Sequence, residues 1–252
     1  MKIATLGRSR TPNASVVAVT ALVTGAGLSL AACGPGVATP IPEPPTLQLG
    51  RIGPPEEPKA ESSAAGGRHI YGNRGAAPVG ATLRVTNLDR TDPASVSMVE
   101  SDGSFDISVV VEDGEELRFD WSRGDERGAP QDARFVKDPS YYHVLPSERF
   151  ACLTLTPGFV VDFGMANQRI LSLDNGCASS ESLTAPRLRR GLPNFSLPSA
   201  LPVSLAPSDS VPLELTATHD RAATTEDTLF FDVTSDGKAI RYPITLLASP
   251  VP

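Results

Sequence analysis

Apolar and polar side chains alternate in short runs along this chain. The segments 81–87, 105–109 and 117–121 each place every second residue on one apolar face, which is the pattern of a strand with one side buried. Turn-forming pairs such as Asp102-Gly103 and Asp113-Gly114 separate these segments. Short strands at spacings of about 8–12 residues, without a sustained helical period, predict an all-β fold of the sandwich type.

The second half of the chain carries the strongest of these signals. Residues 228–233 and 240–246 flank Asp236-Gly237, a dipeptide that supplies the positive φ angles of a tight hairpin. Further strand signals lie at 95–99, 159–163, 169–173 and 212–218, and residues 141–145 fit either a strand or a stretch packed between domains. We therefore expect two β-sandwich domains, at 68–123 and 151–249, with a connecting segment at 124–150.

The first part of the chain has a different character. Three basic residues lie among the first ten, and an apolar stretch from Ala14 ends in Leu30, Ala31, Ala32 and Cys33. This resembles the signal peptide and lipobox of bacterial lipoproteins. The resemblance implies that residues 1–32 are a signal peptide, that the Cys33 thiol receives a diacylglycerol, and that the new amino terminus at Cys33 is acylated after cleavage.

A membrane-spanning anchor and an ordinary cleaved signal are the alternatives. The stretch 14–32 has 19 residues, close to the roughly 20 needed to span a bilayer. It contains Thr20, Gly25 and Ser29, however, and small residues followed by Gly34-Pro35-Gly36 end it. Small residues before a cleavage point, behind a basic head, favour a removed signal.

Residues 33–67 are predicted to hold the lipid anchor and a tether. Proline is frequent at 40–45 and 54–58, and it excludes helix and inner strand because it fixes φ and lacks an amide donor. Such stretches favour the extended polyproline II conformation, at about 3.1 Å per residue. Residues 61–67 then become rich in Ser, Ala and Gly.

The charge of the chain limits the classes of partner that it is expected to bind. Cleavage before Cys33 would leave 19 basic and 29 acidic residues, a net charge of −10, which argues against nucleic-acid binding. Without a polybasic patch, attachment to the membrane is expected through the acyl chains on Cys33 alone. Lipoproteins kept in the inner membrane commonly have Asp after the lipidated cysteine, so Gly34 favours the outer membrane.

The two remaining cysteines, Cys152 and Cys177, are predicted to form a disulfide. An exported chain meets an oxidising compartment, where thiols pair. The bridge would close a loop of about 25 residues and add roughly 3 kcal/mol of stability. Two separate buried thiols are the alternative.

The first predicted domain resembles bacterial immunoglobulin-like and carboxypeptidase-regulatory-like domains. The matching residues are Ile70-Tyr71-Gly72, 75–81, Asp102-Gly103-Ser104-Phe105, and Gly114 before Leu117. The resemblance implies that the Asp-Gly-Ser-Phe stretch joins two hairpin strands and that Phe105 enters the core.

The second predicted domain is similar to immunoglobulin-like domains of the ASPM/SPD-2/Hydin, or choice-of-anchor, type. The matching pieces are Val161-Asp162-Phe163-Gly164, a strand ending at Asn175, residues 205–210, and the hairpin at 228–246. Cys177 and the Pro-rich stretch 186–202 depart from that family's pattern. Both resemblances concern the fold and imply no function.

No catalytic or metal-binding constellation stands out. His69, His143 and His219 are far apart in sequence, whereas zinc needs several His or Cys in close spacing. The pair His219-Asp220 fits a solvated strand end better than a catalytic triad, and neither a Gly-x-Ser-x-Gly elbow nor a Gly-rich phosphate loop is present.

Three other groups have a functional and a plain interpretation. The acids between Glu100 and Glu116 could bind calcium, but their spacing is that of a solvated face. The basic run 187–190 could contact a carboxylate or a lipid head group, and a solvated loop is the plainer interpretation. Trp121 and the tyrosines at 141–142 could bind a ligand, although core packing suits Trp121 better.

The sequence thus predicts a lipid-anchored cell-envelope protein, of the outer membrane, that acts as a non-catalytic interaction or structural module. It predicts no cofactor or metal beyond the covalent lipid at Cys33, and a protein partner in the envelope. An accessory subunit of a secretion or adhesion complex, bound by strand addition, is the alternative. An unrecognised hydrolase with scattered site residues is a remote one.

Overall fold

The computed structural model describes residues 46–56, 67–137, 142–197 and 203–250. Within these ranges the protein is all-β, with a single 3-10 turn (η1, Leu49–Arg51) and no α-helix. The sheets are antiparallel apart from one parallel pair. The predicted signal peptide and Cys33 lie outside the described residues.

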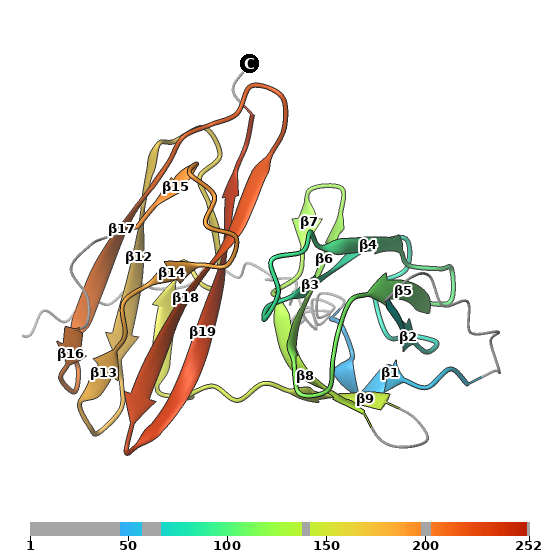
Figure 1. Cartoon of the computed structure of the whole chain (residues 1–252), viewed down its shortest axis with the longest axis horizontal. Helices are drawn as coiled ribbons and strands as arrows, with labels where there is room; N and C mark the ends of the chain where they lie inside the picture. The colour runs from blue at the N-terminus through green and yellow to red at the C-terminus, as the bar shows by residue number, and fades with distance from the viewer. Residues whose placement is uncertain (1–45, 57–66, 138–141, 198–202, 251–252) are drawn as a thin grey trace, which may run out of the picture. The chain divides into compact units, whose positions relative to one another are not determined.

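Two sheets and one apolar core make up the first sandwich (Figure 1, blue to green). One sheet has the order β1-β2-β5 and the other β4-β3-β6-β8-β9, with β7 paired to β6. The strands are β1 (Ile52–Gly53), β2 (Arg68–Gly72), β3 (Thr82–Asn87), β4 (Ser95–Met98), β5 (Phe105–Val109), β6 (Glu116–Arg123), β7 (Glu126–Arg127), β8 (Gln131–Lys137) and β9 (Tyr142–Pro146).

The alternation predicted from the sequence places the right side chains in this core. Leu83, Val85 and Phe119 point inward, and Phe105 follows the turn at Gly103, whose φ is +81°. Phe105 is buried, as the domain resemblance implied, but the expected hairpin is wrong, because β4 and β5 on either side of this stretch belong to different sheets. Its ring lies against Gly72, where a β-carbon would collide with it.

Part of the predicted tether belongs instead to this sandwich. Leu47 and Ile52 are buried in its core, and β1 pairs with β2 through Ile52 and Gly72. The side chain of Gln131 donates a hydrogen bond to the Leu47 carbonyl at 2.9 Å. The physical reason is local, because residues 46–53 contain no proline and offer apolar side chains to an unpaired sheet edge.

The predicted connecting segment 124–150 is also too long. Strands β7, β8 and β9 lie within it and complete the second sheet of the first sandwich. Ala133, Phe135 and Val144 are core residues. Charged residues between the inward-facing positions of β8 had hidden the strand.

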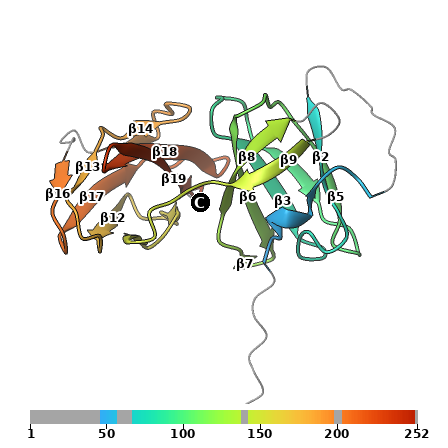
Figure 2. The ribbon, with the colours of Figure 1, turned by 90° about the horizontal axis from the view of Figure 1, so that it is seen from below.

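The second sandwich again has two sheets around a separate core (Figure 1, yellow to red; Figure 2). One sheet has the order β10-β12-β17-β15 and the other β11-β19-β18-β13-β16, with β14 paired to β18. The strands are β10 (Leu153–Thr156), β11 (Val160–Asp162), β12 (Gln168–Asn175), β13 (Glu181–Leu183), β14 (Arg187–Leu188), β15 (Phe195–Ser196), β16 (Val203–Leu205), β17 (Ser210–Ala217), β18 (Thr225–Ser235) and β19 (Lys238–Ala248).

Two predicted features are present in this sandwich. Strands β18 and β19 form the long hairpin, and Asp236 and Gly237 have φ angles of +47° and +79° at its turn. Cys152 and Cys177 form a disulfide, with their Cα atoms 4.9 Å apart. It joins the start of β10 to the end of β12, where the Gly176 amide also donates to the Cys152 carbonyl at 2.9 Å.

Candidate functional site: a polar junction between the two sandwiches

The outer faces of two sheets meet in a buried junction. On β18 and β19, Thr228, Phe230, Thr245 and Leu247 alternate with the core residues, so they point away from the core of the second sandwich, yet they too are buried. On β6, the equivalent outward residue Arg118 is only 1% exposed. Buried residues on outer faces mean that each sheet is covered on both sides.

Arg118 occupies the centre of this junction with its hydrogen-bonding capacity fully used. Its Nε and one terminal nitrogen donate to the two carboxylate oxygens of Asp132, at 2.7 and 2.9 Å. The terminal nitrogens also donate to three acceptors of the second sandwich: Thr245 Oγ1 at 2.9 Å, the Pro243 carbonyl at 2.6 Å and the Phe159 carbonyl at 3.4 Å. A buried guanidinium is stable only when paired and satisfied in this manner.

The charges around Arg118 compensate each other. Burial alone would raise the pKa of the Asp132 carboxyl, but the positive charges of Arg118 and Arg149 outweigh it and hold that pKa below its usual value. Arg149, between the two sandwiches, donates to Asp132 at 2.7 Å and to Glu116 at 3.2 Å. The centre of the junction is thus an ionised network at neutral pH.

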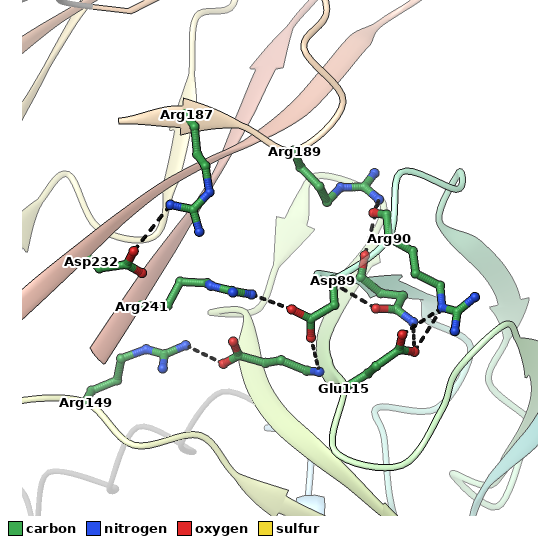
Figure 3. Close-up of polar contacts among 10 residues, drawn as sticks. Asp89, Arg90, Glu115, Arg149, Arg187, Arg189, Asp232 and Arg241 are labelled. Carbon is green, nitrogen blue, oxygen red and sulfur yellow. Dashed lines mark hydrogen bonds and ion pairs between the residues drawn. The ribbon is translucent and has the colours of Figure 1, made fainter. Parts of the chain in front are cut away.

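A second arginine, Arg189, reaches from the second sandwich to backbone oxygens of the first. One of its terminal nitrogens donates to the carbonyls of Asn87, Arg90 and Asp92, at 3.2, 2.7 and 2.8 Å. Figure 3 shows Arg189 beside Arg90. Burial lowers the pKa of Arg189. The expectation of a solvated loop at 187–190 is therefore wrong for Arg189.

Neighbouring residues of the basic run are also engaged. Arg187 pairs with Asp232 at 3.3 Å (Figure 3). It also lies over the ring of Phe230, and its backbone joins β14 to β18. The Arg190 amide donates to Asp227 at 2.9 Å. The sequence could not show these partners because they lie at least 37 residues away from the run or on the other sandwich.

Two more ion pairs cross the junction. Arg241 of β19 contacts Asp89 at 2.6 Å, as Figure 3 shows, and Arg84 of β3 pairs with Glu226 of β18. Together with Arg118, Arg149 and Arg189, five arginines therefore link the sandwiches. Isolated surface pairs contribute little to stability, but a network around a buried ion can fix a geometry.

A cleft of about 390 Å³ lies beside the network. Asp120 lies in its wall, directly opposite Arg84 on β3, and Phe159 and Leu247 face it from the second sandwich. Burial raises the pKa of the Asp120 carboxyl, and the charges of Arg118 and Arg84 only partly offset this. Within the described ranges the Asp120 carboxyl has no hydrogen bond or ion pair, so the cleft wall contains a carboxyl without a directly bonded partner.

The other residues considered from the sequence do not converge on one point. His69 contacts Asp106 at 2.8 Å in the first sandwich, and His143 belongs to β9. His219 has the carbonyls of Ser249 and Ala166 at 2.8 and 3.1 Å from its two ring nitrogens. Trp121 is buried in the first core, as expected.

The acids between Glu100 and Glu116 are used locally. Asp102 accepts the Ser104 amide, Asp113 accepts the Lys137 amide, and Glu115 pairs with Arg90 at 2.9 Å. Among the described residues, no group of three or more His, Cys, Asp or Glu is placed to hold a metal ion. Nor does that part of the chain contain a helix long and apolar enough to cross a membrane.

Comparisons with known proteins identify no family. No family model and no curated protein matches the chain. Among solved structures, it is similar to the VesB protease of Vibrio cholerae, with 14% identity and a TM-score of 0.32 over 70% of this chain and 64% of that one. The chain thus spans less than two thirds of VesB.

Two other solved structures are similarly distant. A Porphyromonas gingivalis W83 protein of unknown function has 14% identity and a TM-score of 0.32, over 67% of this chain and 84% of that one. Salmonella alpha-2-macroglobulin reacted with methylamine has 14% identity and a TM-score of 0.28, over 62% of this chain and 10% of that one. At such TM-scores these similarities carry no argument about fold, activity or partners.

Proposed function

We propose that the protein is a lipid-anchored, non-catalytic module of the cell envelope, whose two sandwiches act together as one rigid interaction or structural unit. Leu30, Ala31, Ala32 and Cys33 supply the anchor in this proposal, and Gly34 directs it to the outer membrane. The protein needs no cofactor other than the covalent lipid at Cys33.

The observation that carries this proposal is the buried Arg118 junction. Linked domains usually meet through modest interfaces and move relative to each other. Here a fully satisfied guanidinium bonds to Asp132 on its own side and to Thr245 and Pro243 on the other. Such a contact holds one geometry, which suits a spacer or a docking platform better than a hinged enzyme.

The disulfide supports an address outside the cytoplasm. Bridges of this kind form in oxidising compartments, and Cys152–Cys177 joins two neighbouring segments of the second sandwich. The lipidated cysteine and a short tether would keep the module near the membrane surface. Two or more acyl chains suffice for stable anchoring.

The finer domain types are part of the proposal. We infer an immunoglobulin-like first sandwich of the carboxypeptidase-regulatory-like kind and a second of the ASPM/SPD-2/Hydin kind. In the second, the chain runs through β10 in one sheet and then β11 in the other, where β11 is parallel to β19. This division of the first strand between both sheets supports an immunoglobulin-like topology.

Labelling in cells tests the anchor. The wild-type chain should incorporate labelled palmitate and fractionate with the outer membrane, whereas Cys33→Ser should do neither. A Cys33→Ser variant that still takes up palmitate would contradict the proposal. Hydrolytic activity that survives purification and disappears on changing His143 or His219 would contradict its non-catalytic part.

A further inference from the structure

Strand β12 has a half-covered edge. It pairs with β17 from Gln168 to Asp174, but β10 covers its other side only from Ser172 to Asn175. After Thr156 the chain leaves this sheet and continues as β11 in the other one. Along Gln168–Leu171, no strand of the described chain lies beside β12 on that side.

The backbone groups at this edge can be assigned from their neighbours. The Asn167 carbonyl accepts the Ala217 amide at 2.9 Å, and the Gly176 amide donates to Cys152 at 2.9 Å. Because successive residues of an antiparallel strand point alternately to the two sides, odd-numbered residues of β12 face β17 and even-numbered ones face β10. The N–H and C=O groups of Gln168 and Ile170 therefore point to the uncovered side.

A notch of about 550 Å³ lies against this edge. Pro157, Val160 and Ile170 give it an apolar lining, and Ile170 is 56% exposed. The Arg169 guanidinium spans to the backbone oxygens at the end of β11, where it donates to Asp162 at 3.1 Å. An open strand edge beside an apolar notch provides both backbone bonds and a place for side chains.

One edge of the first sandwich, that of β4, is closed by comparison. On edge strand β4, the hydroxyls of Ser95 and Ser97 donate to the β5 carbonyls of Ser108 and Asp106, at 2.6 and 2.9 Å. Side chains thus bridge the gap between its two sheets. Proteins usually protect strand edges against pairing, so an unprotected one marks a site for a partner.

We propose that an extended segment of a partner protein adds to β12 at Gln168–Leu171, continuing the line of β10 antiparallel to β12. Its backbone would bond to Gln168 and Ile170. Its side chains would lie against the apolar lining of the notch, which includes Val160 and Ile170. The segment is therefore uncharged, with apolar residues at alternate positions. This inference rests on the proposed function as an interaction module and names the chemistry of the partner.

Amide hydrogen exchange on the purified chain is the first test. The Ile170 amide should exchange at least about a hundredfold faster than those of Arg169 and Leu171, which bond to β17. Equal protection of all three amides would overturn the proposal, because the edge would then be covered.

A defined peptide is the second test. The probe is a blocked six-residue peptide of alternating threonine and valine, and its control carries N-methyl groups on alternate amides. The plain peptide should protect the Ile170 amide. Ile170→Lys should weaken binding by about tenfold or more, whereas Val96→Lys, which changes an equally exposed residue on β4, should leave it unchanged. Equal binding of both peptides, or an equal loss in both variants, would refute strand addition.

Photo-cross-linking in cells then identifies the occupant. A cross-linker at position 170, but not one at 96, should join the chain to a partner, and a synthetic copy of the cross-linked segment should protect the Ile170 amide. Cross-linking only to a second copy of this chain, or to its own residues, would overturn the partner assignment. The exchange and peptide results do not depend on lipid, so failure of Cys33 lipidation would leave them standing.

Discussion

Replacing Arg118 with methionine should uncouple the unfolding of the two sandwiches. The variant keeps much of the side-chain volume but removes the guanidinium, so Asp132 retains only Arg149 as a cationic partner. The acceptors at Thr245, Pro243 and Phe159 lose their donor as well. Breaking a buried pair by removing one partner typically costs about 3–5 kcal/mol, a large share of the roughly 5–15 kcal/mol that stabilises a domain.

Urea unfolding followed by two signals measures this effect. Trp121 is the only tryptophan and reports the first sandwich, while circular dichroism reports both. In the wild type the two transitions should coincide, and in Arg118→Met they should separate, since neither sandwich then supports the other. The double variant Arg118→Met, Asp132→Leu should recover part of the loss, because it leaves no unpaired buried charge.

Arg123→Met on the same strand is the matched control. Arg123 is exposed and paired with Glu126 at 2.7 Å, so its loss should cost less than about 1 kcal/mol. Equal destabilisation by Arg118→Met and Arg123→Met would contradict a coupling role for Arg118, as would two transitions of Arg118→Met that still coincide at an unchanged urea midpoint.

The remaining predictions concern charge, packing and the disulfide. Folding raises the pKa of the Asp120 carboxyl, so its ionised form opposes folding at neutral pH. Asp120→Asn should raise the urea midpoint at pH 7, and most of this gain should be absent near pH 4. A lower midpoint at pH 7 would contradict this, because it would mean that Asp120 stabilises the fold. Folding lowers the pKa of the Asp132 carboxyl. Its contribution to stability is therefore complete above the usual pKa of about 4 and is lost as the pH falls through the lower pKa of the folded state. The junction should loosen in acid, and unchanged coupling of the two transitions at pH 2.5 would contradict this. Replacing both Cys152 and Cys177 with serine should cost the second sandwich about 3 kcal/mol of stability. An unaltered urea midpoint of the second sandwich would contradict this. In the Arg118→Met background, where the junction is already broken, the same change should leave the Trp121 transition nearly unchanged. Gly128→Ala should destabilise the first sandwich because a β-carbon there collides with the Trp121 indole, and wild-type stability of this variant would refute that packing.

Much of the fold followed from alternation and turn chemistry. The strands around Leu83, Phe105 and Phe119 have one buried face, and the Asp236-Gly237 turn has the required φ angles. Alternation also found β12 and β17. These signals are local, so one sequence is enough to predict them.

Other elements were missed because nearby residues masked them. Leu47 and Ile52 lie between two proline-rich runs. The proline content of this region predicts a tether, although the residues between the runs form a short core segment. The strand β8 has charged residues at its outward positions, and the side chain of one of them, Asp132, is buried between Arg118 and Arg149. Composition over a window cannot reveal such partners.

One local feature of the sequence does indicate the junction. Strand β19 contains Ile244-Thr245-Leu246-Leu247-Ala248, and all five residues are buried. A run without polar alternation indicates a strand covered on both faces. The identity of the covering surface, and the role of Arg118 in it, depends on contacts more than 120 residues apart, and no local pattern specifies them.

A distance measurement between the two sandwiches shows whether they form one rigid unit. Spin labels at Val96→Cys in the first sandwich and Met165→Cys in the second, both exposed positions, report their separation by double electron–electron resonance. We expect one narrow distance distribution in the wild-type background and a broad one in Arg118→Met. A broad distribution in the wild-type background, or a narrow and unchanged one after Arg118→Met, would contradict a rigid unit held by the buried arginine.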